Sequence, residues 1–250
     1  MFLKLRPFFY TLIFLIGLEL IVVFHRHVLV LVVFLFILSL YQGKDMGKKW
    51  KFSILPIFFT LSSTALLYLI TVRYEQQIFI LLTSFMYYLA LFGAYRLTRY
   101  SLDQTARAMN MASSVSTIFF ATAGAYGLYL NFLVPLWQLM VAYLVVTLLV
   151  SYQYFSIISP QDGDSSGKKV WIYSFLLALS MSEIIWAINF WPFGYLTSGV
   201  IALILYYVLW DLIQSHFLNL LSRKRVVANL IFFSVMIFLV LFTSKWLPVR

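Results

Sequence analysis

The chain has no cysteine, only eight acidic residues and few charges of either sign. The absence of cysteine excludes disulfides, thiolate metal sites, a cysteine nucleophile and a lipidated cysteine. Charged residues make up 10% and hydrophobic residues 63% of the 250 positions, whereas a soluble domain usually has about 25% charged and roughly 45 to 50% apolar residues. The bilayer is therefore the expected solvent, and no sizeable soluble domain fits in the chain.

Sequence motifs of known chemistry are also missing. The chain contains no H-E-x-x-H, G-x-S-x-G or Walker A pattern, and no pair of acids spaced for metal–diphosphate chemistry. No cofactor is expected. The formal charge of +10 is divided among short separate segments and forms no continuous stripe, so nucleic acid is not an expected partner.

Long apolar runs predict an all-α, polytopic transmembrane helix bundle of about nine spans, since a spanning helix needs about 20 mainly apolar residues. With the basic pair Lys4 and Arg6 before it, the first run is interpreted as an uncleaved signal anchor. The second run has about 14 residues, so the alternative is seven spans plus an N-terminal re-entrant hairpin. The spans are expected near 7–24, 28–41, 53–72, 77–95, 109–130, 133–155, 170–190, 194–213 and 226–247.

The distribution of basic residues predicts the orientation. On this layout fourteen of the eighteen Lys and Arg residues fall on one side, which is the cytoplasmic side by the positive-inside rule. The N-terminus is then inside and the C-terminus outside, in the cytoplasmic membrane of a bacterium. Anionic headgroups attract basic residues at the membrane surface. The expected contacts with anionic lipids are Lys44, Lys48, Lys49, Lys51, Arg223, Lys224 and Arg225.

One segment, SPQDGDSSG at Ser159–Gly167, has the composition of a linker. It suggests a six-helix membrane region at 1–155, a cytoplasmic linker loop at 156–169 and a three-helix membrane region at 170–250, together forming one integrated bundle. Small residues at helical spacing in 109–130, such as Ser113, Thr117 and Gly124, predict that this helix packs closely against its neighbours.

Glu183 is the leading candidate for a buried polar site. It lies about 20 Å along its span at 1.5 Å per residue, where an ionised carboxylate costs about 2.5 to 3.5 kcal/mol. Trp186, Ala187 and Phe190 share its helical face, and Asn189 lies on a neighbouring face. We therefore expect Glu183 to be protonated, paired or exposed to a wet cavity.

Glu19 is a second candidate, at a similar predicted depth in the first span. Two acids close together could share a proton or a cation, because both cannot stay ionised cheaply. The alternative is that neighbouring side chains lock each acid separately. The expected neighbours are Arg26, Arg73, Tyr10, Ser180 and Ser182.

Two further polar features receive simpler interpretations. His25 and His27 are weak candidates for metal ligands with Glu19, but an H-x-H pair in a short turn is commonly a solvated feature and no third protein ligand is identified. No metal site is therefore predicted. Asp211 is expected to lie near the inner end of its span, in contact with the basic group Arg223–Arg225.

The stretch from Trp171 to Trp246 contains SEIIWAINFWPFG followed by LYYVLWD. Through this aromatic pattern it resembles uncharacterised polytopic membrane proteins of small-genome bacteria. The resemblance covers the last three spans and implies a three-helix module that includes Glu183 and Asp211. It implies no activity.

Three functions remain open at this stage. The preferred hypothesis is a non-enzymatic accessory or scaffold protein, in which Glu183 is paired and dry. The first alternative is a small permease or proton-coupled carrier that uses Glu183, with Glu19, in a water-filled path. The second is a lipid-modifying enzyme, which requires a lipid-sized groove and another reactive group beside Glu183. No proline interrupts a predicted span at its centre, which disfavours the broken helices typical of many transporters.

Overall fold

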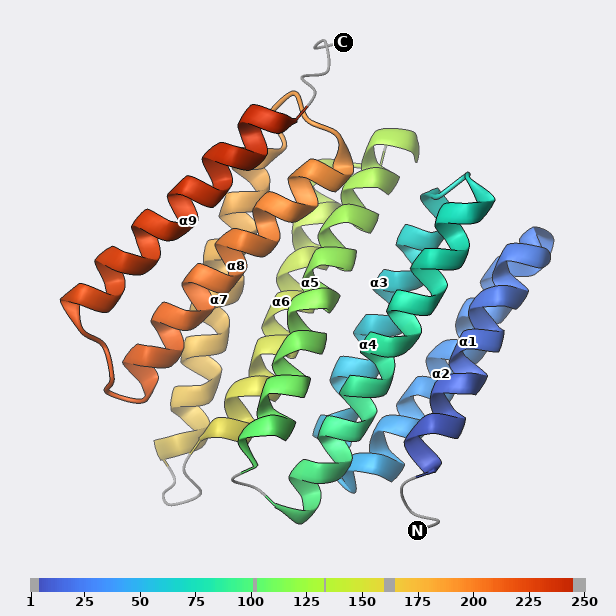
Figure 1. Ribbon diagram of the computed structural model, residues 1–250, viewed down its shortest axis with the longest axis horizontal. Helices are drawn as coiled ribbons and strands as arrows, with labels where there is room; N and C mark the ends of the chain where they lie inside the picture. The colour runs from blue at the N-terminus through green and yellow to red at the C-terminus, as the bar shows by residue number, and fades with distance from the viewer. Residues whose placement is uncertain (1–4, 101–102, 133, 160–164, 245–250) are drawn as a thin grey trace. The chain divides into compact units, whose positions relative to one another are not determined.

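The computed structural model describes residues 5–100, 103–132, 134–159 and 165–244, except for the side chains of His25, Ser165, Ser166 and Arg225. Within these ranges the structure contains nine α-helices, two short 3-10 helices and no strand (Figure 1). The prediction of an all-α chain is confirmed. The elements are α1 (Arg6–Val23), η2 (His25–His27), α2 (Val28–Gly47), η3 (Trp50–Ser53), α3 (Ile54–Leu69), α4 (Arg73–Arg99), α5 (Gln104–Phe132), α6 (Leu136–Ile158), α7 (Ser165–Ile188), α8 (Tyr195–Phe217) and α9 (Arg223–Thr243).

The chain divides into two compact units, Met1–Gly124 (unit 1) and Ala125–Arg250 (unit 2). The boundary falls inside α5, whereas the sequence placed a linker at 156–169. Part of that segment is helical, because α6 continues to Ile158 and α7 begins at Ser165. Residues 160–164 lie outside the described residues.

Eight helices among the described residues are long and apolar enough to cross a membrane. The exception is α5, which has 29 residues and is therefore about 43 Å long at 1.5 Å per residue. Its interior includes Asn110, Ser113, Ser114 and Thr117, which lower its mean hydropathy. The chain is thus compatible with a membrane at eight of these helices, and the count of nine spans stays a prediction.

The first two helices are both of spanning length. α2 has 20 residues, from Val28 to Gly47, and so continues past the 14-residue apolar run that suggested a re-entrant segment. Lys44 and Asp45 remain helical in its last turn. Lys48 then ends the helix in a left-handed conformation with φ of 53°, as is common at helix C-termini. This length is compatible with a full span, and the choice between two spans and a re-entrant hairpin stays a prediction.

α4 is the central helix of unit 1. It packs against α1, α2 and α3, and it meets α5 where the Ser113 hydroxyl donates to the carbonyl oxygen of Met86 at 3.0 Å. A Cβ at Gly93 of α4 would lie 3.2 Å from a carbonyl oxygen of α5, and a Cβ at Gly124 of α5 would lie 3.2 Å from the backbone nitrogen of Leu66 in α3. Small residues thus allow α5 to approach both neighbours closely.

An aromatic cluster fills the middle of unit 1. The ring of Phe14 stacks on Tyr87 with centroids 4.1 Å apart, and the Phe59 ring lies 5.8 Å from Tyr87. The Tyr87 hydroxyl donates to Oε1 of Gln42 at 2.7 Å. All four side chains are at most 1% exposed, so they join α1, α2, α3 and α4 in one interior.

In unit 2 the helices pack mainly on their chain neighbours, and α6 also contacts α8. α6 packs along α7, α7 on α8, and α8 on α9. The Trp171 ring of α7 lies 4.4 Å from Tyr152 of α6, and the hydroxyls of Ser151 and Tyr206 are 3.3 Å apart across α6 and α8. The apolar stretch of α9 has none of its residues buried.

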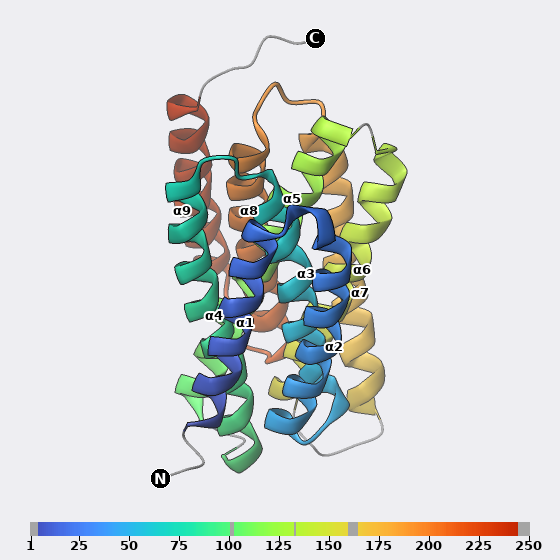
Figure 2. The same cartoon turned by 90° about the vertical axis from the view of Figure 1, so that its right-hand side faces the viewer.

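Each unit concentrates basic residues at one of its ends. In unit 1 this end is formed by the start of α1, the α2–η3 turn and the α4–α5 turn (Figure 2), and Arg26 and Arg73 lie at the opposite end. In unit 2 it is formed by the start of α7 and the turn between α8 and α9. The pattern within each unit is the one that the positive-inside rule produces. The basic ends carry Arg6, Lys44, Lys48, Lys49, Lys51, Arg96, Arg99 and Arg107 in unit 1, and Lys168, Lys169, Arg223 and Lys224 in unit 2.

Candidate functional site

Glu183 lies on an exposed apolar face of α7. Leu176, Leu179, Trp186 and Phe190 are 48%, 38%, 49% and 66% exposed, and Glu183 itself is exposed. These residues recur at helical spacing, and we call the five of them the Glu183 face. Among the described residues Glu183 has no hydrogen bond or ion pair. The carboxylate is therefore directed away from the interior of its own unit.

The residues that follow Glu183 define the end of the face. The ring of Trp186 contacts Phe190 edge-on at 5.2 Å. Glu183 is five residues from the helix end at Ile188, a distance of about 7.5 Å along the axis. Asn189 is half-buried, and its Oδ1 is buried with no hydrogen-bond partner among the described residues. Trp186 is exposed on the same side of α7 as Glu183, and Asn189 follows the end of the helix; a polar site formed by these residues stays a prediction.

Glu19 is held by a carboxamide. It is half-buried on α1 and accepts a hydrogen bond from Nε2 of Gln77 in α4 at 3.1 Å. The sequence had suggested Tyr10 as one possible partner, but the Tyr10 hydroxyl donates to Asp45 at 3.0 Å. Glu19 belongs to unit 1 and Glu183 to unit 2, so a proton shared between them stays a prediction.

No three His, Asp or Glu side chains gather into a metal-binding group among those that the structure describes. His27 is the last residue of η2, the 3-10 helix between α1 and α2. The side chain of His25 lies outside the described residues. The weak metal candidate His25–His27 therefore stays untested.

Asp211 is the buried carboxylate of the described chain, at 9% exposure. It lies in α8, six residues before the end of the helix at Phe217, and it accepts a hydrogen bond from Nδ2 of Asn229 in α9. The sequence predicted a contact with Arg223–Arg225, and the Arg225 side chain lies outside the described residues. Asn229 was missed, although a single carboxamide inside an apolar helix is a signal for a polar contact between helices.

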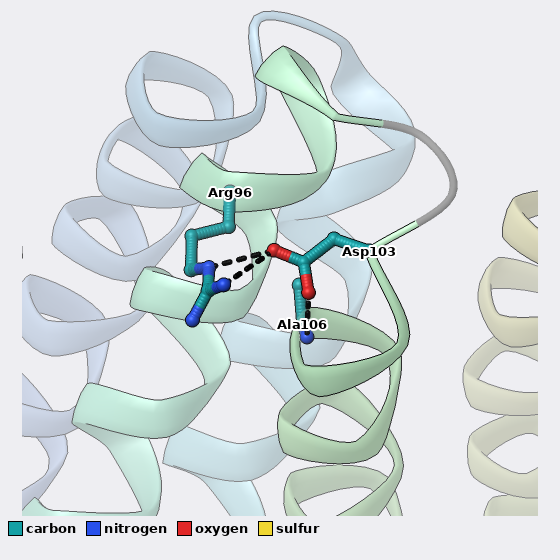
Figure 3. A network of polar contacts seen from close by, with 3 residues as sticks. All are labelled: Arg96, Asp103 and Ala106. Atoms are coloured by element: carbon teal, nitrogen blue, oxygen red, sulfur yellow. Dashed lines mark hydrogen bonds and ion pairs between the residues drawn. The ribbon is translucent and has the colours of Figure 1, made fainter.

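A polar network at the basic end of unit 1 was also missed. Asp103 accepts hydrogen bonds from Arg96 at 2.8 Å to Nε and 2.7 Å to Nη2. Its other carboxylate oxygen accepts from the backbone N–H of Ala106 at 3.1 Å. Figure 3 shows how one carboxylate caps the first turn of α5 and binds the last turn of α4. The network fixes the turn between these two helices.

The interior of unit 1 contains polar groups that lack partners. Asn110 is 1% exposed, and neither its Oδ1 nor its Nδ2 has a hydrogen-bond partner among the described residues. The same holds for Nε2 of Gln42 and Oγ of Ser84. Such groups cost free energy in a dry interior and are often satisfied by water or a ligand. These residues were not among the candidates from sequence.

Comparison with known families assigns the chain to a family whose activity is not known. A family model described as "Protein of unknown function (DUF5656)" matches residues 39–243. The chain belongs to this family. The match runs from the second half of α2 to the end of α9, so it extends well beyond the three helices that carried the resemblance in the sequence, and it agrees with an uncharacterised family. No curated protein and no solved structure is significantly similar to the chain.

Proposed function

We propose that the protein is a multi-pass integral membrane protein that acts as a non-enzymatic accessory component and holds a partner membrane protein against the Glu183 face. The observation that carries this proposal is the exposure of Glu183 among exposed apolar side chains. A carboxylate that faces hydrocarbon is costly. A donor on a transmembrane helix that covers the face would offset this cost, and the surrounding Leu, Trp and Phe side chains supply packing surface.

The location that we propose is the cytoplasmic membrane of a bacterium. The basic end found within each unit supports an inside N-terminus and an outside C-terminus. The exposed aromatics at helix ends support interfacial placement, because Trp and Tyr are enriched at membrane–water boundaries. Trp50, Tyr100 and Trp171 are 60%, 69% and 46% exposed.

Carbodiimide labelling of Glu183 tests the accessory function. Carbodiimides modify protonated carboxyl groups in apolar surroundings, and mass spectrometry locates the modified residue. The reaction is run on the full chain in native membranes and again after purification in detergent, with Glu183→Gln as the control that assigns the signal. We expect protection in native membranes and labelling after purification, because removal of the partner uncovers the face.

The other outcomes have distinct meanings. Equal labelling in both preparations would mean that Glu183 faces lipid without a partner, and it would overturn the accessory function at this face. Labelling that decreases as the pH is raised, to the same extent in both preparations, would favour a carrier. Protection in both preparations would show an inaccessible acid, which contradicts the exposed position of Glu183.

A carrier is the second candidate, and the unpartnered polar groups inside unit 1 favour it. A water-filled path past Asn110 and Ser84 would satisfy them. The natural absence of cysteine allows a direct test: Ser84→Cys is treated with a membrane-impermeant thiol reagent, with Ser174→Cys as the control. Both serines are buried, at 4% and 0% exposure, and Ser174 donates to the carbonyl oxygen of Val170 at 2.8 Å. Rapid modification at position 84 alone would support a carrier, and inert thiols at both positions would exclude this path.

A further inference from the structure

The turn between α2 and α3 in unit 1 is held in a fixed shape by two glycines. A Cβ at Gly43 would lie 2.6 Å from the Cα of Ser53, and a Cβ at Gly47 would lie 2.2 Å from the Cβ of Phe52. η3 therefore packs directly on the last turn of α2. Phe52 is 5% exposed, and the Ser53 hydroxyl donates to the carbonyl oxygen of Leu40 at 2.9 Å. The turn is thus a built structure rather than a loose connection.

This turn presents lysines around an exposed indole. Lys44, Lys48 and Lys49 are exposed and Lys51 is half-buried. The Nζ of Lys44 lies 4.0 Å from the centroid of the Trp50 ring, a cation–π contact, and Trp50 is 60% exposed. We call Lys44, Lys48, Lys49, Trp50 and Lys51 the basic turn.

The acid within this segment is already engaged. Asp45 accepts a hydrogen bond from the Tyr10 hydroxyl at 3.0 Å, and its Oδ2 lies 3.9 Å from Nη1 of Arg6. Both partners come from the first turns of α1. Asp45 therefore binds α1 and does not cancel the charge of the neighbouring lysines, so the basic turn keeps a positive surface.

An exposed apolar strip leads along α2 to the basic turn. Phe34, Ile37 and Tyr41 are 55%, 60% and 62% exposed. They recur at intervals of three and four residues, and Lys44 follows Tyr41 after three, so all four share one helical face. Lys48 comes next, directly after the end of the helix. One face of α2 thus changes from apolar to basic within a single turn.

We propose that this face of α2 binds an anionic phospholipid, with the acyl chains along Phe34 and Ile37 and the phosphate group at the basic turn. A phospholipid likewise changes from apolar acyl chains to an anionic headgroup along its length. Trp50 lies where the face changes from apolar to basic, and Trp is enriched at such membrane–water boundaries. A free phosphate would use the lysines and leave the apolar strip uncovered. The proposal requires α2 to be embedded in a membrane, and it is independent of any partner at the Glu183 face.

Native mass spectrometry of the full chain tests this proposal. The protein is released from bilayers that contain equal amounts of phosphatidylglycerol and phosphatidylcholine, and the retained lipids are counted. The test variant is Lys44→Gln/Lys48→Gly, in which glycine suits the left-handed backbone at position 48. The matched control is Lys168→Gln/Lys169→Gln, which removes two exposed charges from α7. Lys44→Arg/Lys48→Arg keeps the charge.

The expected result is selective loss of one lipid class at one site. The unchanged chain, the α7 control and the arginine variant retain phosphatidylglycerol, and the Lys44→Gln/Lys48→Gly variant binds it roughly 30-fold more weakly, since each lysine contributes about 1 kcal/mol. Should that variant fail to insert, Lys44→Gln alone still gives a fall of roughly fivefold. Insertion itself is checked in pure phosphatidylcholine, which separates a failure of membrane embedding from a failure of lipid binding.

Three results would overturn the proposal. An equal loss of phosphatidylglycerol in the α7 control would mean that the lipid responds to the general surface potential and not to a site. Displacement of phosphatidylglycerol from the unchanged chain by millimolar inorganic phosphate would assign the basic turn to a free anion. Retention in all variants would show that the lysines at 44 and 48 do not hold the lipid.

Discussion

Unit 1 and unit 2 bury their helices in different ways. In unit 1 four neighbours surround α4, and the Phe14–Tyr87–Gln42 contacts join three of the helices in one interior. In unit 2 the helices pack mainly on their neighbours in the chain, and the apolar stretch of α9 is not buried at all. The helices of unit 1 therefore converge on α4, whereas unit 2 buries parts of α6, α7 and α8 and leaves the apolar stretch of α9 unburied.

This difference separates the two kinds of candidate site. The unpartnered polar groups of Asn110, Ser84 and Gln42 lie inside unit 1, where a ligand or water would have to enter. Glu183 is exposed on the surface of unit 2, where a partner could bind without entering an interior. An accessory function thus depends on the surface of unit 2, and a carrier function on the interior of unit 1.

The largest expected difference between the units comes from removing one aromatic ring from each. Phe14→Ala deletes a fully buried ring of unit 1, and Phe238→Ala deletes a ring of α9 that is 65% exposed. Loss of a buried aromatic ring typically costs about 3 to 5 kcal/mol. Because apolar side chains are not driven from lipid as they are from water, we expect about 3 kcal/mol for Phe14→Ala and almost no change for Phe238→Ala. The free energy of unfolding is measured by SDS titration in micelles.

A similar loss in both variants would contradict the comparison. It would mean that α9 is covered in the folded protein. A loss of stability in Phe238→Ala alone would mean that the ring of Phe238, and not that of Phe14, is packed in a stable interior.

Glycine substitutions provide a second contrast. A Cβ at Gly43 would lie 2.6 Å from backbone and 2.9 Å from the carbonyl oxygen of Phe52, whereas a Cβ at Gly167 in α7 has nothing within 4 Å. Gly43→Ala should therefore destabilise the chain by about 1 to 3 kcal/mol through overpacking. Gly167→Ala should stabilise it by up to about 1 kcal/mol through helix propensity.

The same SDS titration measures both glycine variants. Tolerance of Gly43→Ala without loss would show that η3 moves easily from the end of α2. That result would also remove the fixed geometry on which lipid binding at the basic turn depends. A lower free energy of unfolding in Gly167→Ala would show that the start of α7 is covered.

The helices were predictable from sequence and the exposed faces were not. Apolar runs located the nine α-helices of the described residues, and helical spacing predicted that Trp186 and Phe190 share a face with Glu183. The direction of that face could not be derived, because in lipid both the outer and the inner faces of a helix are apolar. The length of α2 was underestimated for a related reason: Lys44 and Asp45 stay helical beyond the end of the apolar run, where hydropathy no longer marks the helix.

Polar partners were the least predictable part of the candidate site. Asp103 with Arg96, Asp211 with Asn229, and Glu19 with Gln77 each join different helices. Such pairs depend on the rotation and depth of two helices at once, and neither is encoded in the local pattern of one span. Whether the Asn110 carboxamide finds a hydrogen-bond partner also depends on the position of the neighbouring helices.

Variants of Asp103, in the turn between α4 and α5, test whether local polar contacts contribute to the stability of unit 1. Asp103→Ala removes the helix cap and the ion pair with Arg96, whereas Asp103→Asn keeps a cap acceptor and loses the charge. Capping contributes about 0.5 to 2 kcal/mol. The ion pair adds at most about 1 kcal/mol, because the Arg96 side chain is 35% exposed. We expect a loss of about 1 to 2 kcal/mol for the alanine variant and less for the asparagine variant, in the same SDS titration. Equal losses would assign the effect to charge alone.

The smallest expected effect concerns the unpartnered polar groups, and it compares the two interiors directly. Asn110→Leu in unit 1 and Thr147→Val in unit 2 each replace a buried polar group that lacks a described partner with an apolar group of similar shape. If both interiors are dry, each variant should gain up to about 1 kcal/mol, since an unsatisfied buried group is unfavourable. A loss of stability at Asn110 alone would mean that water or a solute satisfies this carboxamide in the folded protein. The accessory function would then no longer be sufficient, because the interior of unit 1 would hold a polar molecule within the membrane, as a carrier requires.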